Sequence, residues 1–295
     1  MLRIGICFFA TGVFLSAGER PTGVPSEFNR VREGSFSQTS KPPTQITVFN
    51  WNIERGLQLT NIENAIEMHR PDLCIFQEVD LHARRTEGRD VAQDLAKQFS
   101  FNYAFGIEFE ELGQSIGGEP AFHGQATLSN LPIRNSRVLR FSHQSGFWKP
   151  SPLLVSGLPL LQRRLGGRIA LVSEIGEYRK TPLVVYNLHL ESRGGEDGRL
   201  EQLNEVLADA ERYPANVPVI IAGDLNTKYR NSPVIPRLRE AGYRNCFGDR
   251  KERTHWLVGD LDFIFVRGPI QVEDGAVHRE DHGSDHYPVV ARLKL

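Results

Sequence analysis

The sequence is poor in cysteine, with three in 295 residues. Cys7, Cys74 and Cys246 show neither the paired spacing of a disulfide framework nor that of a zinc site. Cys74 lies inside an apolar run, so we expect it to be a small core residue. The cysteine content therefore argues against a disulfide-stapled scaffold and against a thiolate metal centre.

An excess of charge of either sign is also missing. The chain has 35 basic and 36 acidic residues, which leaves a net charge of -1. No global field attracts the chain to nucleic acid or to an anionic membrane. This neutrality counts weakly against a dedicated nucleic-acid binder, although a local basic rim remains compatible with it.

Long hydrophobic runs are absent beyond the N-terminus. There, Arg3 precedes an apolar stretch over 4–15, and Ser16, Ala17 and Gly18 follow as small residues. The stretch is too short for an ordinary spanning helix, so we interpret residues 1–18 as a signal peptide. This predicts a secreted or periplasmic protein. A buried strand or a misassigned start is the alternative, and would leave the protein cytoplasmic.

Residues 19–44 are rich in Pro, Gly, Ser and Thr and have few large apolar side chains. They are interpreted as a flexible linker. From Gln45 to Leu295 the pattern is globular, with no internal repeat and no break. We therefore expect a single domain over 45–295.

Apolar patterning predicts more strands than helices in this domain. The helices are interspersed among the strands rather than strictly alternating with them, which favours two packed sheets with helices outside over a parallel doubly wound sheet. The segment 142–159 is either a surface loop or a cap in which Phe147 and Trp148 cover the core. The expected strands are 46–49, 73–76, 103–107, 123–129, 168–174, 183–188, 219–222, 261–266 and 287–295, and the expected helices are 60–69, 90–99, 199–212 and 233–241.

One stretch, VIIAGDLNT over 219–227, shows how polar residues follow these strands. An apolar run ends at Gly223, where the backbone can turn, and Asp224 and Asn226 follow. Their carboxylate and amide can face one opening, as in a cation or phosphate site. Taken alone, the pair is better explained as a turn or helix cap.

The same arrangement recurs along the chain. Singly, His189 could be a satisfied core histidine, Glu78 a surface carboxylate and Asp285 a loop residue. Taken together, these residues are less well explained by such ordinary structural roles. Burying acids and histidines inside apolar runs costs free energy unless they have partners or a metal. The polar residues at strand ends are Asn52, Glu78, His189, Asp224, Asn226, Asp285 and His286.

Six motifs, taken in order, resemble the endonuclease/exonuclease/phosphatase superfamily of metal-dependent phosphoesterases. They cover the chain from Gln45 to its C-terminus. The resemblance implies an α/β fold, a four-layered α-β-β-α sandwich of two packed mixed sheets, with the active site at one end of the paired sheets. The motifs are Asn50-Trp51-Asn52-Ile53, Gln77-Glu78-Val79, Asn187-Leu188-His189-Leu190, Gly223-Asp224-Leu225-Asn226, Leu261-Asp262-Phe263-Ile264-Phe265-Val266 and Ser284-Asp285-His286.

The resemblance also implies roles. Glu78 is the principal ligand of Mg²⁺ or Mn²⁺, with Asn52 close by and Asp285 assisting. Asp224 orients or deprotonates the attacking water, and Asp262 fixes the ring of His286 on the scissile phosphate. Two further residues, Asn226 and His189, bind phosphate oxygens. His123 aligns loosely with a phosphate-contacting side chain of some members.

Substrate class stays open at this stage. The expected function is hydrolysis of a phosphoester, foremost a phosphodiester, by in-line attack of an activated water, with an exported nuclease as one form. A phospholipid or sphingomyelin phosphodiesterase is the rival enzyme. A non-catalytic binding module on the same fold is the rival of another class. We expect a nucleic-acid or phospholipid substrate, a monomer and no stable protein partner.

Overall fold

The computed structural model of the chain describes residues 24–39, 43–148, 164–178, 180–193, 195–228 and 232–295. The expected signal peptide at 1–18 lies outside these residues, and so does the second half of the segment 142–159. Within the described ranges, no helix is long and apolar enough to cross a membrane.

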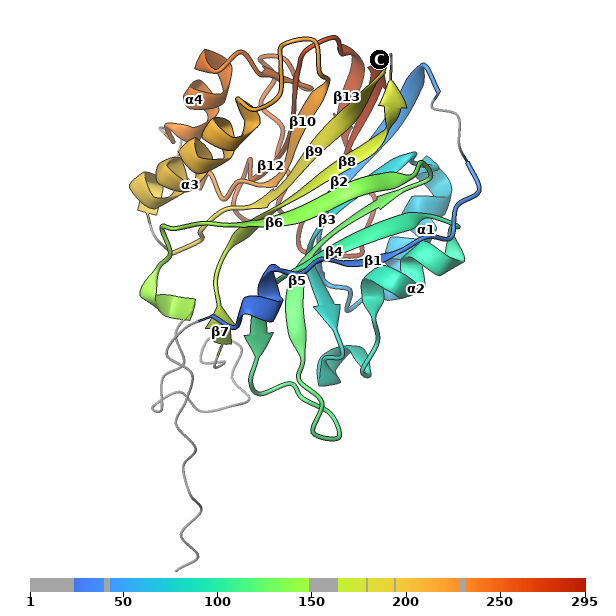
Figure 1. Cartoon of the computed structure of the whole chain (residues 1–295), viewed down its shortest axis with the longest axis vertical. Coiled ribbons are helices and arrows are strands. Elements are labelled where there is room, and N and C mark those ends of the chain that lie inside the picture. Colours follow the sequence, from blue (N-terminus) through green and yellow to red (C-terminus); the bar gives the residue numbers. More distant parts are fainter. Residues whose placement is uncertain (1–23, 40–42, 149–163, 179, 194, 229–231) are drawn as a thin grey trace, which may run out of the picture.

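Two mixed sheets form the centre of the molecule (Figure 1). The first has the order β1-β4-β5-β3-β2-β14-β13, with β7 paired to β4, and the second has the order β11-β12-β10-β9-β8-β6. The first sheet consists of β1 (Arg32–Gly34), β2 (Gln45–Arg55), β3 (Leu73–Leu81), β4 (Asn102–Glu111), β5 (Phe122–Ser129), β7 (Arg164–Gly166), β13 (Gln271–Val277) and β14 (Val289–Lys294). The second consists of β6 (Ile133–Arg140), β8 (Ile169–Tyr178), β9 (Thr181–His189), β10 (Val219–Asp224), β11 (Arg244–Asn245) and β12 (Asp262–Arg267).

The helices cover the outer faces of the two sheets. In Figure 1, α1 (Leu59–His69) and α2 (Val91–Gln98) lie outside the first sheet, and α3 (Gly195–Ala210) and α4 (Val234–Glu240) lie outside the second. Three short 3₁₀ helices, η1 (Ser26–Asn29), η2 (Arg84–Thr86) and η3 (Gly146–Trp148), complete the elements. The layer order is helix, sheet, sheet, helix. This confirms the expected four-layered α-β-β-α sandwich.

The layers are held by two apolar clusters. One lies between α1, α2 and the first sheet and includes Ile62, Phe49 and Phe76. The other runs from the space between the sheets to α3 and includes Ile75 and Tyr186. Each sheet thus buries both faces, which explains why strands such as β10 are apolar without alternation.

Two βαβ units place strand ends at a common edge. β2 and β3 are parallel and joined through α1, and β9 and β10 are parallel and joined through α3. The carboxyl ends of parallel neighbours meet at one edge of their sheet. Every polar motif at the end of β2, β3, β9 and β10 therefore lies at the same end of the sandwich.

The expectation of a flexible linker over 19–44 is wrong for the part that the structure describes. Residues of β1 pair with β4, and Arg32 lies opposite Phe105. Phe28 is only 2% exposed and packs edge-on against Phe122. A single well-placed aromatic and three paired residues suffice to dock a segment whose composition is otherwise polar.

The short strands β7 and β11 were also missed, and so were two longer ones, β6 and β13. Both lie at the edge of a sheet and are largely half-buried or exposed. Polar side chains such as Arg134 and Glu273 hide the strand pattern there, because an edge strand has one neighbour and solvent on the other side. Of the two aromatics left open, Trp148 is buried, so it caps the core.

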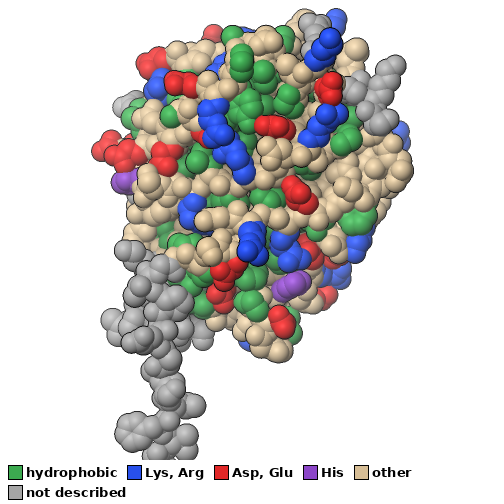
Figure 2. Space-filling view, viewed as in Figure 1, with side chains coloured by type: hydrophobic (Ala, Val, Ile, Leu, Met, Phe, Trp, Pro, Cys, Tyr) green, Lys and Arg blue, Asp and Glu red, His purple; other side chains and the backbone are tan. Residues whose placement is uncertain are grey.

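Figure 2 shows basic and acidic side chains interspersed over one face of the molecule, without a large area of one sign. This distribution agrees with the net charge of -1.

Candidate active site

Backbone irregularities in β2 and β3 aim two predicted site residues at the opening between the sheets. Asn52 lies opposite Gln77, and directly after this pair the register shifts in both strands. Glu78, in the irregular part of β3, has a φ of 50°, and Glu54 in β2 has a φ of 45°. A left-handed conformation is costly for a non-glycine residue and clusters at functional sites. These bulges redirect the side chains of Asn52 and Glu78.

The second sheet contributes three residues by register alone. Asp224, the last residue of β10, lies opposite His189 at the end of β9 and opposite Asp262 at the start of β12. Gly223 makes this approach possible, because its φ is 146° and a Cβ there would lie 1.9 Å from the carbonyl oxygen of Leu188. The glycine of the GDLN motif is thus required by strand packing.

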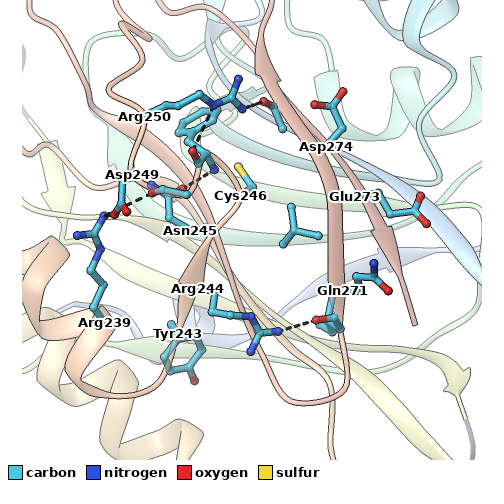
Figure 3. A pocket seen from close by; sticks show the side chains of 15 residues that line it. Arg239, Tyr243, Arg244, Asn245, Cys246, Asp249, Arg250, Gln271, Glu273 and Asp274 are labelled. Atoms are coloured by element: carbon cyan, nitrogen blue, oxygen red, sulfur yellow. Dashed lines mark hydrogen bonds and ion pairs between the residues drawn. The ribbon is translucent and has the colours of Figure 1, made fainter.

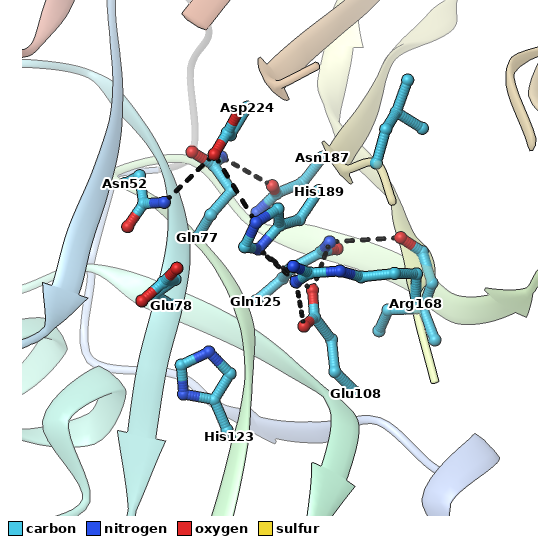
Figure 4. Close-up of polar contacts among 12 residues, drawn as sticks. Asn52, Gln77, Glu78, Glu108, His123, Gln125, Arg168, Asn187, His189 and Asp224 are labelled. Carbon is cyan, nitrogen blue, oxygen red and sulfur yellow. Dashed lines mark hydrogen bonds and ion pairs between the residues drawn. The ribbon is translucent and has the colours of Figure 1, made fainter. Parts of the chain in front are cut away.

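Asp224 is the centre of the site (Figure 4). Its Oδ1 accepts a hydrogen bond of 2.9 Å from the backbone N–H of Asn226. Its Oδ2 lies 3.2 Å from Nδ2 of Asn52, 3.5 Å from Nε2 of His189 and 3.8 Å from Nε2 of His286. Three donors from both sheets therefore converge on one carboxylate oxygen.

Asp262 and His286 form a buried pair beside Asp224. Oδ2 of Asp262 lies 2.8 Å from Nδ1 of His286. Burial alone would lower the pKa of His286, but the charges of Asp262, Asp224 and Asp285 outweigh it and raise that pKa to about 10. Burial raises the pKa of the Asp262 carboxyl, and the imidazolium of His286 offsets part of the rise. In the absence of a metal ion, His286 is an imidazolium held by Asp262.

His189 is oriented by a buried ion pair that sequence reasoning missed. Nη1 of Arg168 lies 2.8 Å from Oε2 of Glu108 and 2.7 Å from Nδ1 of His189. Because a guanidinium only donates hydrogen bonds, Nδ1 of His189 accepts, and its proton is on Nε2, which faces Asp224. Burial would raise the pKa of Glu108, yet Arg168 above all brings it to about 2.

No local sequence pattern marked Glu108 or Arg168 as a site residue. Glu108 is one of three acids in the second half of β4, with Glu110 and Glu111, and Arg168 stands just before β8. Only the pairing of these side chains across the two sheets shows their role. A charged residue in a run that must be buried was the one available hint.

A second group of acids lies next to Asn52. Glu78 faces Arg55, with 3.4 Å between Oε2 and Nη1. Burial would raise the pKa of Glu78, but Arg55, with smaller help from His123, His189 and Arg168, holds it well below the usual range. Burial, together with the charges of Asp285 and Glu78, raises the pKa of Glu54.

This acidic group suits a hard divalent cation. Carboxylate and amide oxygens of Glu78, Asp285 and Asn52 are the donor type that Mg²⁺ and Mn²⁺ prefer. Glu54 adds a carboxylate beside this group, and its pKa is raised mainly by burial and to a smaller extent by the charges of Asp285 and Glu78. The residues present therefore fit the ion that the sequence motifs implied.

Two predicted residues are placed less directly. Asn226 meets Asp224 through its backbone, while its Nδ2 donates to the carbonyl oxygen of Leu190, 3.0 Å away. Asp285 contacts His255, with 3.6 Å between Oδ2 and Nε2, and is partly exposed. His255, whose ring stands edge-on to His286 at 4.7 Å, was not predicted.

His123 is separated from the Asp224 group. Its Nδ1 lies 3.0 Å from Oδ1 of Asp80, and its ring stacks on Phe109. Burial lowers the pKa of His123, and Asp80 offsets part of this change. In Figure 4 the ring lies on the Glu78 side of the site. The structure thus gives His123 a direct partner in Asp80 and no hydrogen bond to the other predicted site residues it describes.

Two clefts lie near the second sheet. One, of about 870 Å³, lies where β11 approaches β13 (Figure 3), and its arginines are engaged. Arg239 pairs with Asp249, and Arg250 donates to the carbonyl oxygen of Gly275. None of the predicted site residues lines it. The other, of about 1110 Å³, borders Thr227 and Asp260, next to the site.

Comparisons with known proteins agree with this fold. The sequence profile described as the Endonuclease/Exonuclease/phosphatase family matches residues 49–286. No curated protein sequence matches the chain significantly.

Several solved structures share the fold. An endonuclease/exonuclease/phosphatase of Beutenbergia cavernae is 20% identical with a TM-score of 0.63, over 85% of this chain and 72% of its own. The human Nocturnin catalytic domain with bound sulfate is 17% identical with a TM-score of 0.64, over 90% of this chain and 97% of its own. A mannosyl-6-phosphatase of Bacteroides thetaiotaomicron is 18% identical with a TM-score of 0.60, over 85% and 100%.

The members of this family hydrolyse phosphoester bonds, and the profile match extends from β2 to the Ser284-Asp285-His286 motif, so that it includes both halves of the site. The chain belongs to the endonuclease/exonuclease/phosphatase family and is a phosphoester hydrolase.

Proposed function

We propose that this protein is a divalent-metal-dependent phosphodiesterase in which Asp224 activates the attacking water. The convergence of Asn52, His189 and His286 on Oδ2 of Asp224 carries the proposal. These three groups are donors that now face the carboxylate, Asn52 by a hydrogen bond and the two histidines at longer range, and a phosphoryl oxygen entering the site would receive hydrogen bonds from them. Asp224 would then be free to accept the proton of a water.

The metal would be held by Glu78, with Asn52 and Asp285 completing the protein ligands. A bound Mg²⁺ or Mn²⁺ would supply charge neutralisation for the phosphoryl group in the transition state. Arg55, which now faces Glu78 at 3.4 Å, compensates part of the carboxylate charge in its absence.

The remaining residues act as fixed donors. His189 presents an Nε2 proton because Arg168 engages its other nitrogen. His286 presents its Nε2 because Asp262 engages Nδ1. Donors held in place before the reaction stabilise developing charge without reorganisation, and one such donor contributes about 10²–10³-fold in rate.

A polyanionic chain, that is a nucleic acid, is the substrate that the neighbouring cleft favours. Beyond Asn226 the cleft presents the ammonium groups of Lys228 and Lys251, and its other charged lining residues are Arg239, Asp249, Arg250 and Asp260. Ammonium groups beside a scissile phosphodiester would contact the flanking phosphates of such a chain. The signal peptide expected at residues 1–18 would make the protein an extracellular or periplasmic nuclease.

A phospholipid phosphodiesterase is the second candidate, favoured by one observation. Trp256 and Leu257 are 55% and 66% exposed and directly follow His255 of the site. Exposed apolar residues at the rim of a site suit an interfacial substrate.

An activity panel separates these possibilities. Metal-stripped protein would receive Mg²⁺ or Mn²⁺ and be tested on DNA, RNA, sphingomyelin vesicles, and a chromogenic phosphodiester and phosphomonoester. We expect metal-dependent cleavage of the diesters and of nucleic acid, and loss of most metal affinity in Glu78→Gln. Full turnover in excess chelator would contradict the proposal. Selective cleavage of vesicles that is lost in Trp256→Ala would establish the second candidate.

A further inference from the structure

A cluster of two histidines and two acids lies apart from the active-site residues, at the junction of α1 with the connection from β13 to β14. It consists of His69, the last residue of α1, and His278, Glu280 and Asp281 of the connection. No role in the proposed reaction uses these side chains. One ligand atom each of His69, His278 and Asp281 lies within 4.8 Å of the other two.

The geometry within the cluster is close. Nε2 of His69 lies 2.8 Å from Oδ2 of Asp281. The ring centroids of His69 and His278 are 4.2 Å apart, and the two ring planes meet at 60°. Such a tilt lets two imidazoles direct nitrogens at a common point, which flat stacking would prevent.

Charge at the cluster favours a cation. The neutral imidazole of histidine is the form that binds a metal ion. Glu280 and Asp281 contribute two negative charges. The adjacent cation, Arg279, is directed away, because its guanidinium contacts Glu252 and the carbonyl oxygen of Arg253.

His278 also has the support that metal-bound histidines usually have. Its Nδ1 lies 2.9 Å from Oε1 of Glu280. A carboxylate on one ring nitrogen fixes the ring and raises the basicity of the other. The ring of Phe49 packs against the His69 ring, with 5.5 Å between the centroids, and this packing limits the movement of His69.

We propose that His69, His278 and Asp281 form a second metal site, for Zn²⁺ or an ion of its class, oriented by Glu280. Two imidazoles and one carboxylate are typical zinc ligands, with nitrogen distances of about 2.0–2.1 Å. Ligand atoms around a tetrahedral ion with bonds of about 2.0 Å lie about 3.3 Å apart. Nε2 of His69 and Oδ2 of Asp281, now 2.8 Å apart, would therefore separate slightly to admit the ion, and His278 would adjust within the 4.8 Å limit.

The position of this site indicates what it does. Asp281 precedes Asp285 and His286 by a few residues, and Asn61 of α1 already donates to the carbonyl oxygen of His282 at 2.7 Å. An ion shared by α1 and the connection would fix the segment that carries Asp285 and His286. The ion would affect catalysis only indirectly, by ordering this segment, and it would stabilise the fold directly.

The test is zinc binding to the full chain after chelator treatment, by titration calorimetry and by metal analysis after desalting. Wild type, His278→Ala and Glu280→Gln would be compared, with His282→Ala as the matched control, since His282 is exposed in the same connection. We expect wild type and His282→Ala to bind one more equivalent of Zn²⁺ than His278→Ala. Glu280→Gln should bind with an affinity lower by about 10–100-fold.

Two further measurements test the zinc site separately from the active site and from the proposed function. Zinc should raise the thermal midpoint of wild type and of the Glu78→Gln variant by more than that of His278→Ala, which keeps the active site. Mg²⁺, which prefers oxygen ligands, should give no such increment. Should His278→Ala be unstable, His69→Gln serves as the second variant. Equal zinc stoichiometry and equal midpoints in wild type and in either ligand variant would overturn the site.

Discussion

Oδ2 of Asp262 lies 2.8 Å from Nδ1 of His286, and the pair is buried between the start of β12 and the segment before β14. Through this contact a carboxylate of the second sheet fixes an imidazole carried by the first. The contact joins the two halves of the site.

The charge state of His286 follows from that contact. With a pKa of about 10, the ring should remain an imidazolium at pH 8 in metal-free protein. Asp262→Asn removes the largest opposing charge, so the pKa should fall from about 10 toward its usual value, with Asp224 and Asp285 still opposing burial. Histidine ring NMR measures this directly, with Asp274→Asn as the exposed control. A wild-type ring that is neutral at pH 7.5 would contradict the assignment.

The same shift has a consequence for stability. Because the pKa is raised on folding, the stabilisation from the pair is fully present below about pH 6.5 and is lost as the pH rises toward 10. Urea unfolding of metal-free protein between pH 6 and 10 should show stability falling in wild type. The fall should be smaller in Asp262→Asn.

Arg168→Met should be strongly destabilising. It leaves Glu108 buried without its partner, and breaking such a pair costs about 3–5 kcal/mol. Arg212→Met removes an exposed pair with Asp209 and should cost at most about 1 kcal/mol. Urea unfolding at neutral pH compares the two. Equal, small losses would mean that the Arg168–Glu108 pair does not bear on the fold.

Glu108 also predicts acid sensitivity. Its pKa of about 2 is below its unfolded value, so its stabilisation is present above about pH 4.5 and is lost as the pH falls toward 2. In Glu108→Gln this part of the acid-side slope should disappear. Unfolding curves at several pH values between 3 and 6 measure the difference.

Gly223→Ala tests the strand approach behind Asp224. Both Gly223 and Gly242 have positive φ, but an added Cβ meets the Leu188 carbonyl oxygen at 1.9 Å in the first and nothing within 4 Å in the second. Gly242→Ala should therefore cost only the backbone strain, about 1–2 kcal/mol. Gly223→Ala should cost clearly more and lower turnover. Equal thermal midpoints for both variants would contradict this account.

Much of the fold and of the candidate site was predictable from the sequence, for identifiable reasons. Asp224, His189 and Asp262 each end or begin an apolar strand, so their motifs could be seen and ordered. The docking of the segment before β2 could not, since it depends on Phe28 and on the backbone pairing of β1 within a polar segment. Glu108, Arg168 and His255 escaped because their roles arise from contacts across sheets and loops, and no local pattern encodes these. The fold and the family were predicted correctly, whereas the roles of the site residues stay predictions.

Turnover of Asp224→Asn tests the central claim most directly. The change is nearly isosteric, and the backbone N–H of Asn226 can still donate to the remaining side-chain oxygen, so the variant should fold as wild type by circular dichroism. A lost general base should lower kcat by about 10²–10⁴-fold with little change in KM, while Asp197→Asn, exposed on α3, should leave both unchanged. Near-wild-type kcat in a folded Asp224→Asn would contradict the account and favour a non-catalytic binding module.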